Sequence, residues 1–560
     1  MASTYPEKAD YIVVGGGLAG CVVASRLKQA DPSLLVVLIE AGDDQTGHPL
    51  TSFPLACFGA HYSDLDYAYQ TVPQANLGGR ECYAAAAKLL SGGSGINYGT
   101  WTRGPAVDFD NWARTVGDDA WSYRGLLPYF RKTEFLETRR SIDQLQHGVD
   151  GPIHVVPVSD SDLDRVYPLR GPIEQAWSEL GLNKSEALQG GARGSITELV
   201  ESWRDGKRQC ASQVYDLSDV TVLTSTIVRR VIVQESSDIK TVTGVELVDG
   251  RVISASKEVI LSCGAYRTPQ VLLLSGIGAQ EELSACGVPQ TVDCPEVGRN
   301  LHDHFAVCMW WRLKHPENGL ALGTPHWDQQ TYGKGLPCDW IAWQGVPQDM
   351  LRAALEQDGE VTKDHALLQS DQCHLETLIP YAPAGAQIAG VEVPLDGSII
   401  TTAVLGMKPT SRGSIKIASD DPERPPVIDL NYYATEADRV SLRYGIRQAL
   451  RLVNDTSLGR DMIQEEIPPE GFATLNSDST DAEIDARVKR VGNTFFHAAG
   501  SASMGRVVDT QLRVLGVERL RVVDASVIPV PIAAHIQATV YAIAEKAADI
   551  IVQSSAAVTR

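Results

Sequence analysis

The 560-residue sequence lacks the patterns that mark several large protein classes. Its first apolar run, residues 11–14, leads directly into glycines and is far too short to span a membrane. Its ten cysteines form no CxxC pair and no Cys/His cluster, which disfavours a metal site and a disulfide framework. No repeat, low-complexity tract or obvious linker divides the chain. With ordinary apolar content, this predicts a globular protein with a large core.

Basic residues are also scarce. Lys and Arg number 49 against 70 Asp and Glu, which gives a formal net charge of -21. Such a surface repels polyanions, so we expect no nucleic-acid partner. The N-terminal residues show no charged segment followed by an apolar core, as a signal peptide has. We therefore expect an intracellular location and no membrane span.

A glycine-rich turn follows the first apolar run at once. Residues 11–14 are typical of a buried strand, residues 21–29 of a helix, and residues 35–39 of a second strand that ends at Glu40. This strand-turn-helix-strand context predicts a dinucleotide site, with Glu40 placed to accept hydrogen bonds from ribose hydroxyls. The pattern leaves FAD and NAD both open.

The residues of this turn have distinct expected roles. Gly15 permits the tight turn, Gly17 lets the backbone approach a pyrophosphate, and Gly20 allows close packing of helix on strand. The N–H groups at the start of the helix, near Leu18 and Ala19, are free to bind phosphates.

Further elements are predicted along the chain. Apolar runs predict strands at residues 220–233, 243–248, 258–261, 399–405, 414–417 and 519–523, and amphipathic patterns predict helices at residues 436–453 and 538–552. Segments that suit a nucleotide site thus occur near both ends. We expect a fold that brings the ends together, with a second domain inserted between them.

Several sequence blocks together resemble one known family. They include Gly-Ala-Tyr-Arg-Thr-Pro at residues 264–269 and His-Ala-Ala-Gly-Ser-Ala-Ser-Met-Gly at residues 497–505. The others lie at residues 40–42, 97–103, 110–112, 121–123, 275–278, 297–304, 411–414, 523–526 and 535–540. In this order and over essentially the whole length, the sequence resembles the glucose-methanol-choline (GMC) oxidoreductases.

The resemblance implies an α/β fold with two domains. One is a discontinuous Rossmann-like FAD-binding domain, expected at residues 1–160, 205–305 and 495–560. The other is a substrate domain, an antiparallel sheet flanked by helices, expected at residues 161–204 and 306–494.

The resemblance also implies cofactor contacts. In addition to the first motif, it assigns them to Ala41, Gly92, Ser94, Asn97, Thr100, Val228, Asp524, Ala525 and Gln537. Asn97 and Thr100 are expected along the flavin and pyrophosphate, the Val228 backbone at adenine, and Gln537 at the isoalloxazine edge. Each has an alternative: Asn97 and Thr100 can cap a turn, and Asp524 can cap a helix.

Two histidines stand at the family's catalytic positions. Removing a hydride from an alcohol carbon requires a base for the hydroxyl proton, and a neutral imidazole suits this task. His497 is predicted to be that base, with His535 as the partner that holds the alcohol oxygen. His302 and His304 are interpreted as structural or flavin-domain residues.

The sequence departs from the family pattern at several places. Ser91 stands where a glycine is usual, and a positive φ there strains a serine. Ile96 stands where some members carry a histidine bonded to the flavin, which favours noncovalent FAD. Trp340, Trp343 and Tyr381 are candidate walls of the substrate entrance.

The predicted function is oxidation of a small alcohol, such as an aromatic or secondary-metabolite alcohol. The hydride passes to flavin N5, and O2 or another oxidant is the final acceptor. One alternative is a lyase or cyclase that keeps the fold and FAD and uses the same histidines for acid-base chemistry. A nicotinamide dehydrogenase is disfavoured, because the blocks around Asp524 and His535 have no role in that class.

Overall fold

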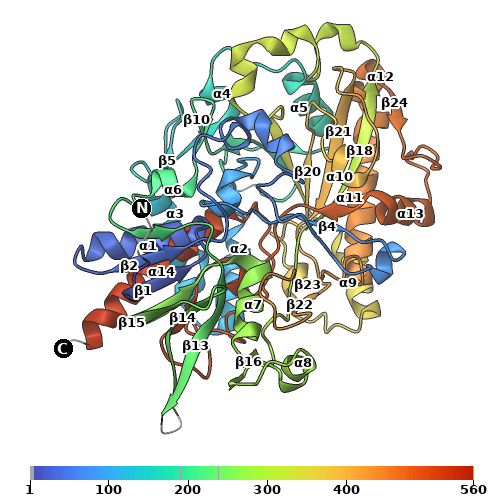
Figure 1. Ribbon diagram of the computed structural model, residues 1–560. Helices are drawn as coiled ribbons and strands as arrows, with labels where there is room; N and C mark the ends of the chain where they lie inside the picture. Colours follow the sequence, from blue (N-terminus) through green and yellow to red (C-terminus); the bar gives the residue numbers. More distant parts are fainter. Residues whose placement is uncertain (1–4, 190–191, 237–238, 559–560) are drawn as a thin grey trace.

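The computed structural model describes residues 5–189, 192–236 and 239–558. Two sheets dominate it (Figure 1). Strands of the first come from residues 8–261 and 520–522, and strands of the second from residues 183–198 and 305–494. The expected combination of a Rossmann-like unit with an antiparallel sheet is confirmed. The domain boundaries themselves stay a prediction.

The first sheet has a parallel part and an antiparallel extension. Its parallel strands are β12 (Thr221–Leu223), β2 (Val36–Ile39), β1 (Lys8–Val14), β15 (Val252–Leu261) and β26 (Leu520–Val522). The extension consists of β14 (Ile239–Leu247) and β13 (Val228–Ser236), which pair antiparallel beyond β15. All four residues of β2 are buried, as a central parallel strand requires.

Two elements differ from their predicted form. Helix α1 (Leu18–Ala30) begins three residues earlier than expected, because the end of the glycine motif forms its first turn. The predicted strand at residues 220–233 is two strands at opposite edges of the sheet, β12 beside β2 and β13 beside β14. Ser225, at φ 48°, lies in the turn between them. The β-branched residues on both sides of Ser225 obscure this turn in the sequence.

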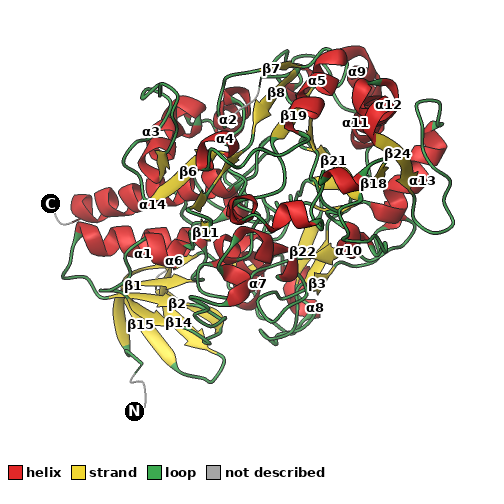
Figure 2. Cartoon of the chain, turned by 90° about the horizontal axis from the view of Figure 1, so that it is seen from above, coloured by secondary structure: helices red, strands yellow, loops and turns green. Residues whose placement is uncertain are grey.

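The two ends of the chain meet on this sheet. Helix α14 (Gln537–Val558) packs against α1 and α3 (Tyr123–Thr133), and Figure 2 shows the three helices beside the strands. Arg26 of α1 forms an ion pair with the fully buried Glu545 of α14 (2.7 Å). The C-terminal helix therefore completes the unit that the N-terminal strand begins.

The second sheet is antiparallel except at one edge. It contains β24 (Ile463–Ile467), β18 (Phe305–Leu313), β21 (Ile399–Gly406), β20 (Leu375–Leu378), β19 (Trp340–Gln344), β8 (Ser195–Glu198) and β7 (Asn183–Lys184), with β25 (Asn493–Thr494) also beside β18. Only β7 pairs parallel, with β8, among the described strands of this sheet. Helix α11 (Glu436–Asp455) packs on β20 and β21, and α9 (Gln348–Gln357) and α13 (Asp481–Val491) pack on α11.

Shorter elements connect these units. The helices are α2 (Ala106–Val116), α4 (Val158–Ser161), α5 (Arg170–Glu179), α6 (Ala211–Val214), α7 (Gly264–Leu274), α8 (Gln280–Ala285), α10 (Ala386–Ala389) and α12 (Ser457–Met462). The small strands are β3 (Tyr69–Gln70), β4 (Tyr83–Ala84), β5 (Glu134–Leu136), β6 (Ile153–Pro157), β9 (Val200–Glu201), β10 (Trp203–Arg204), β11 (Lys207–Arg208), β16 (Ile277–Gly278), β17 (Val292–Asp293), β22 (Ser414–Lys416) and β23 (Val427–Asp429). The predicted strand at residues 414–417 is thus β22, which pairs with β23 outside both large sheets. Among the described residues, no helix is long and apolar enough to cross a bilayer.

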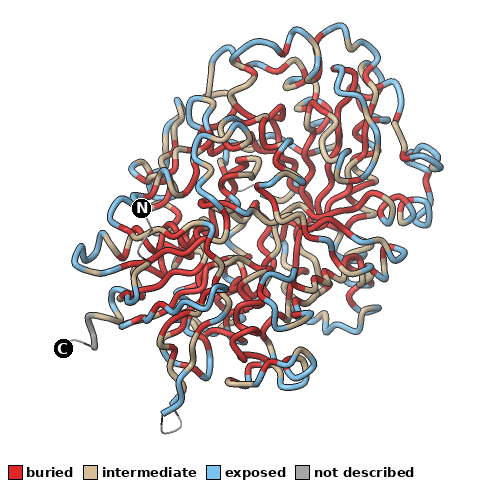
Figure 3. Tube along the Cα trace, in the orientation of Figure 1, coloured by how far each residue is buried: buried red, intermediate tan, exposed pale blue. Residues whose placement is uncertain are grey.

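Both sheets are buried at their centres (Figure 3). The candidate entrance walls lie in this core: Trp340, Trp343 and Tyr381 are at most 2% exposed. Trp343 Nε1 donates to Thr197 Oγ1 (2.8 Å), and Trp340 Nε1 donates to the Arg170 carbonyl (2.9 Å). Their prediction as entrance walls is wrong, because aromatic composition alone does not separate a core from a surface.

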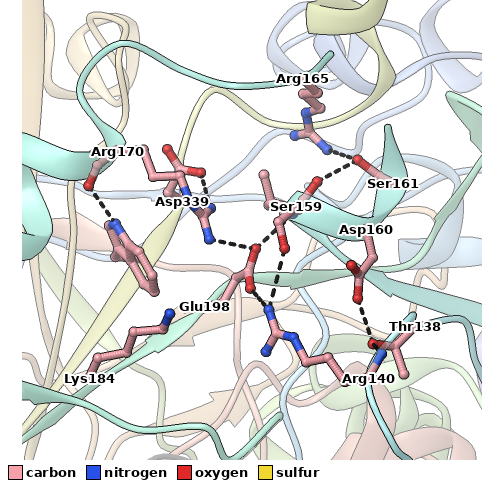
Figure 4. Close-up of polar contacts among 12 residues, drawn as sticks. Thr138, Arg140, Ser159, Asp160, Ser161, Arg165, Arg170, Lys184, Glu198 and Asp339 are labelled. Atoms are coloured by element: carbon pink, nitrogen blue, oxygen red, sulfur yellow. Dashed lines mark hydrogen bonds and ion pairs between the residues drawn. The ribbon is translucent and has the colours of Figure 1, made fainter. Parts of the chain in front are cut away.

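A buried group of charges ties the chain before β8 to the second sheet (Figure 4). We call Arg140, Arg170, Glu198 and Asp339 the ionic network. Glu198 accepts hydrogen bonds from Arg140 and from Arg170 (2.9 Å), and Arg170 also pairs with Asp339 (2.5 Å). Burial raises the pKa of Asp339 to about 6 despite Arg170. For Glu198 burial acts in the same direction, but the arginines and Ser159 outweigh it and lower the pKa.

Candidate active site

A cavity of about 350 Å³ lies between the glycine turn after β1 and the start of α14. Its lining includes Gly15, Gly17, Leu18, Ala19, Glu40, Ala41, Gly92, Asn97, Thr100, Val228, Asp524, Ala525 and Gln537, together with His497 and His535. The structure thus brings together nearly all of the residues predicted for the site, although they are up to 522 positions apart in the sequence. We call this space the cofactor cavity.

Two predicted cofactor residues lie outside its lining. A Cβ on Gly20 would approach the Gly15 carbonyl oxygen to 1.9 Å, so Gly20 serves the helix packing expected of it. Ser94 donates its hydroxyl hydrogen bond to the Ser91 carbonyl (2.7 Å) and accepts one from the Ala211 N–H (2.9 Å). Ser94 therefore braces its own loop, contrary to the predicted cofactor contact.

The nucleotide end of the cofactor cavity offers free polar groups. Helix α1 has Gly17 as its N-cap, without any side-chain cap, so its first N–H groups are available to an anion. Ser262 is one of the lining residues, and its buried hydroxyl has no hydrogen-bond partner among the described residues. A phosphate- and hydroxyl-bearing dinucleotide fits these groups.

Glu40 lies in the wall of the cofactor cavity, directly after β2. Its two carboxylate oxygens accept hydrogen bonds from the N–H groups of Gly16 (2.7 Å) and Gly42 (2.8 Å). Burial raises the pKa of Glu40 to about 7, although these bonds act against the shift. A carboxylate held this firmly can accept further hydrogen bonds from ribose hydroxyls.

The loop before Asn97 is strained where the family pattern is broken. Ser91 has φ 88°, the conformation that favours glycine, at a cost of ~1–3 kcal/mol. Its buried hydroxyl contacts Ser212 Oγ (2.6 Å) and accepts a hydrogen bond from the Ser212 N–H (3.0 Å), which fixes the residue. Gly92 follows at φ 52°, and a Cβ there would lie 2.6 Å from Gly17 Cα. The absence of a side chain at Gly92 thus lets this loop close over the glycine turn.

The Asn97 side chain caps a turn and also lines the cofactor cavity. Asn97 Oδ1 accepts from the Gly99 N–H (3.0 Å), and Asn97 Nδ2 donates to Gln537 Oε1 (3.0 Å). Gln537 Nε2 donates to the Thr100 carbonyl (2.7 Å). The turn-capping alternative for Asn97 is therefore realised, and these bonds lock the loop to the start of α14.

Asp524 caps a turn and also lines the cofactor cavity. Its Oδ1 accepts from the Ser526 N–H (2.8 Å) and caps the 3-10 turn Ala525–Val527. Its Oδ2 accepts from the Gly264 N–H (2.9 Å) and from Thr268 Oγ1 (2.5 Å). Burial raises the pKa of this carboxyl group. Asp524 thus joins β26 to the start of α7 at the cavity wall.

The two predicted catalytic histidines meet at the other end of the cofactor cavity. The ring centroids of His497 and His535 are 4.9 Å apart, and the rings are nearly perpendicular (80°). Phe495 packs on both rings at 5.6–5.7 Å. Residues 497 and 535 therefore form one site with a dinucleotide-binding cradle.

Sequence reasoning missed Glu376, the partner of His535. His535 Nε2 lies 2.8 Å from Glu376 Oε1, and Glu376 is fully buried in β20. Its other oxygen has no hydrogen-bond partner among the described residues. The available signal was a single acidic residue inside the apolar stretch Leu375–Leu378, which is a costly place for a charge.

His304 makes the second contact that sequence reasoning missed. Its Nδ1 lies 2.8 Å from His497 Nδ1, so this histidine touches the predicted base directly. His302, by contrast, turns its Nδ1 to the Asn300 carbonyl (3.1 Å), as a structural residue does. The two histidines lie in one sequence block, but their side chains contact different groups: His302 contacts a backbone carbonyl and His304 contacts His497.

Burial sets the protonation of these rings. It lowers the pKa of His304 to about 3, helped by His535 and Lys408, and lowers the pKa of His497 well below its ordinary value, helped by His535 and His304. Both rings are thus neutral at physiological pH. A neutral imidazole with one free nitrogen can accept a proton, as alcohol oxidation requires.

Comparison with known proteins identifies the fold family. The GMC oxidoreductase profiles match residues 9–306 with the N-terminal part and residues 409–544 with the C-terminal part. This chain belongs to the GMC oxidoreductases. Among curated relatives, the GMC-type oxidoreductase acuG of Aspergillus aculeatus (strain ATCC 16872 / CBS 172.66 / WB 5094) is 41% identical over 543 residues, which covers 97% of this chain and 98% of the relative.

Other GMC oxidoreductases are more distant. Pyranose dehydrogenase 3 of Leucoagaricus meleagris is 31% identical, over 98% of this chain and 93% of the relative. One solved structure is a variant of the formate oxidase of Aspergillus oryzae RIB40, made to examine the effect of a mutation on FAD modification. It superimposes with a TM-score of 0.88 at 29% identity, over 99% of both chains. Pyridoxine 4-oxidase from Mesorbium loti has a TM-score of 0.81 at 28% identity, over 97% and 98% of the two chains. Members of this family are FAD-dependent oxidoreductases, so the chain is an enzyme of that class.

Proposed function

We propose that this GMC oxidoreductase oxidises the CH–OH group of a small alcohol to a carbonyl, with noncovalent FAD as its cofactor. One observation supports this most strongly. The rings of His497 and His535, 4.9 Å apart, line the same cavity as the glycine turn and Glu40. A proton acceptor and a dinucleotide cradle therefore share one space.

The cofactor assignment is supported by the cavity's own residues. The uncapped start of α1, Glu40 and the unpartnered Ser262 hydroxyl suit a pyrophosphate and a ribose. Ile96 lines the same cavity, and its side chain cannot form a bond to the flavin. When bound, FAD supplies the acceptor for the hydride at N5.

Two hydrogen bonds fix the orientation of the histidines. A carboxylate can only accept, so His535 carries its proton on Nε2, facing Glu376. His304 Nδ1 lies 2.8 Å from His497 Nδ1, so one of these two nitrogens carries the hydrogen between them. We assign that hydrogen to His497 Nδ1. His497 Nε2 is then unprotonated, in the tautomer that a base needs.

The proposed reaction balances with these groups. The alcohol R–CH2OH loses its hydroxyl proton to His497 Nε2 and its carbon-bound hydrogen as a hydride, and becomes R–CHO. Glu376, through His535, stabilises the positive charge that then forms on the pair of rings. O2 or another oxidant takes up the two electrons to complete the cycle.

Anaerobic mixing of the FAD-loaded enzyme with alcohols tests the proposal. We expect loss of the oxidised-flavin absorbance with at least one of benzyl alcohol, cinnamyl alcohol, glucose, choline and glycerol. An unchanged flavin spectrum with all five alcohols contradicts alcohol oxidation. Chemical conversion of an alcohol without flavin reduction indicates the lyase or cyclase alternative.

A further inference from the structure

A second, smaller cavity opens beside the histidine pair. It has a volume of about 100 Å³ and shares Tyr98, Thr100, Phe495, Phe496 and His535 with the cofactor cavity. Strands β18, β20 and β21 of the second sheet contribute Ala306, Cys308, Leu378 and Ala403 to its remaining wall. We call it the side chamber. A group that fills it lies directly next to His535.

The walls of the side chamber are apolar. No Asp, Glu, Lys or Arg is among the described residues that line it, whereas Leu378, Ile388 and Val491 are. The two thiols in the wall behave as apolar groups as well, because burial raises the pKa of Cys308 and of Cys338 to about 12. The chamber therefore offers no counter-charge to an ionic substrate.

Three polar side chains in the wall are already hydrogen bonded within the protein. Thr494 Oγ1 donates to Asp303 Oδ2 (2.6 Å), and the Tyr98 hydroxyl bonds to His61 Nε2. Asn493 Oδ1 accepts from Arg80 (3.3 Å). A substrate hydroxyl placed in the chamber would have to compete for these groups. An unmatched buried polar group costs about 1–3 kcal/mol.

The entrance to the chamber is also aromatic. A vestibule of about 1070 Å³ shares Phe58 and Tyr98 with the side chamber and His61 with the cofactor cavity. Tyr98 lines all three spaces. His61 fixes the Tyr98 hydroxyl and stacks on Phe496 at 4.9 Å. An incoming substrate therefore passes rigid aromatic surfaces.

We propose that the substrate is an uncharged alcohol with an apolar body of about one ring, which fills the side chamber while its carbinol carbon lies beside His497 and His535. This inference rests on the proposed alcohol oxidation. An apolar protein cavity of ~150 Å³ accommodates benzene, so the side chamber and the adjoining space suit a single ring. A sugar with several ring hydroxyls would compete for polar groups that are already hydrogen bonded, and a quaternary ammonium alcohol would find no carboxylate in the described lining.

Ranking the alcohols by anaerobic reduction rate tests this substrate class. We expect benzyl and cinnamyl alcohol to reduce the flavin with a kcat/KM at least about a hundredfold above that of glucose, choline or glycerol, which corresponds to two unmatched polar groups. Reduction by glucose, choline or glycerol at a comparable rate overturns the inference but leaves alcohol oxidation standing. Reduction by none of the five overturns both.

A pair of matched variants locates the apolar body. Leu378 in β20 lines the side chamber, whereas Leu405 in the adjacent strand β21 is buried and outside the lining. Leu378→Ala is expected to raise the preference for 4-isopropylbenzyl alcohol over benzyl alcohol by about tenfold, because it makes room for the larger ring substituent. Leu405→Ala is expected to leave this ratio unchanged.

Bound-flavin absorbance establishes that both variants are folded. An equal shift of the ratio in both, or a shift in neither, contradicts placement of the substrate ring in the side chamber. If Leu378→Ala does not fold, Val491→Ala at another part of the wall replaces it, with the same expected direction.

Discussion

The ionic network and the histidine site are both buried polar clusters at the second sheet, yet they differ in how their groups are paired. In the ionic network, each carboxylate faces an arginine, and Arg170 bridges Glu198 and Asp339. In the histidine site, His497 contacts other imidazoles and has a lowered pKa, and one oxygen of Glu376 has no partner among the described residues. Paired charges fix a structure, whereas partly unpaired titratable groups remain available for chemistry.

Removing the base gives the largest effect expected from this comparison. His497→Ala should lower the anaerobic rate of flavin reduction by about 10²–10⁴-fold, the usual contribution of a general base. Bound flavin and the free energy of unfolding should stay close to wild type. His315→Ala, at an exposed histidine, is the control and should have no effect. Full activity in His497→Ala removes His497 from the mechanism.

Breaking the ionic network should lower the stability of the protein and leave the rate of flavin reduction unchanged. Glu198→Gln leaves Arg140 and Arg170 without their shared carboxylate and should lower the free energy of unfolding by about 3–5 kcal/mol, measured by urea denaturation. The reduction rate per bound flavin should be retained. The control Glu465→Gln breaks the exposed pair with Arg312 and should cost no more than about 1 kcal/mol. A similar loss in both variants refutes a special role for the network.

The same substitution at the histidine site sharpens the contrast. Glu376→Gln removes the charge that faces His535 Nε2, and a hydrogen bond to a charged group is worth about 1.5–3 kcal/mol. We therefore expect a roughly 10–100-fold slower reduction, with a smaller change in KM than in kcat. The loss of stability should be smaller than in Glu198→Gln. A variant that is unstable but fully active shows that Glu376 is structural.

Acid should affect the two regions unequally, with the smallest effect per group. Burial lowers the pKa of His61 and of His374 to about 4 and that of His304 to about 3. Burial also lowers the pKa of His497 well below its ordinary value. Their stability contribution is complete above pH 6.5 and is lost as the pH falls from 6.5 to about 4, because the unfolded chain binds the protons first. Each ring contributes about 1.4 kcal/mol per pH unit in this window.

Urea unfolding between pH 7 and pH 4.5 measures this slope. The double variant His61→Gln and His374→Gln should show a shallower decline than wild type, since two of the buried rings are gone. An unchanged slope means that other groups govern the acid sensitivity.

Local pattern and family motif made much of this molecule predictable. The glycine turn and Glu40 follow from a short block whose spacing is read directly from the sequence, and the pairing of His497 with His535 is what the family resemblance implies. Glu376 and His304 were not assigned to the site, because their roles arise from long-range contacts with His535 and His497. Ser91 was recognised as anomalous, but its compensating contact with Ser212, 121 positions away, was not visible.

The aromatic residues show the same limit. Trp340 and Trp343 lie in a strand in which all five residues are buried. Their aromatic character alone did not show whether they face the core or the substrate entrance. The aromatic wall of the side chamber comes instead from Phe58, Tyr98 and Phe496, which belong to loops and short turns. Periodicity is a weak guide to such segments, because their side-chain directions are set by tertiary contacts.

The joining of both chain ends on one sheet has a consequence for biosynthesis. Strand β15 pairs with β1 and with β26, and Gln537 at the start of α14 completes the cofactor cavity. During translation, β26 and α14 leave the ribosome only after the segments that carry β1 and β15 have been made. The nascent chain therefore cannot close the cofactor cavity until α14 has emerged, so cofactor uptake must follow the synthesis of this helix.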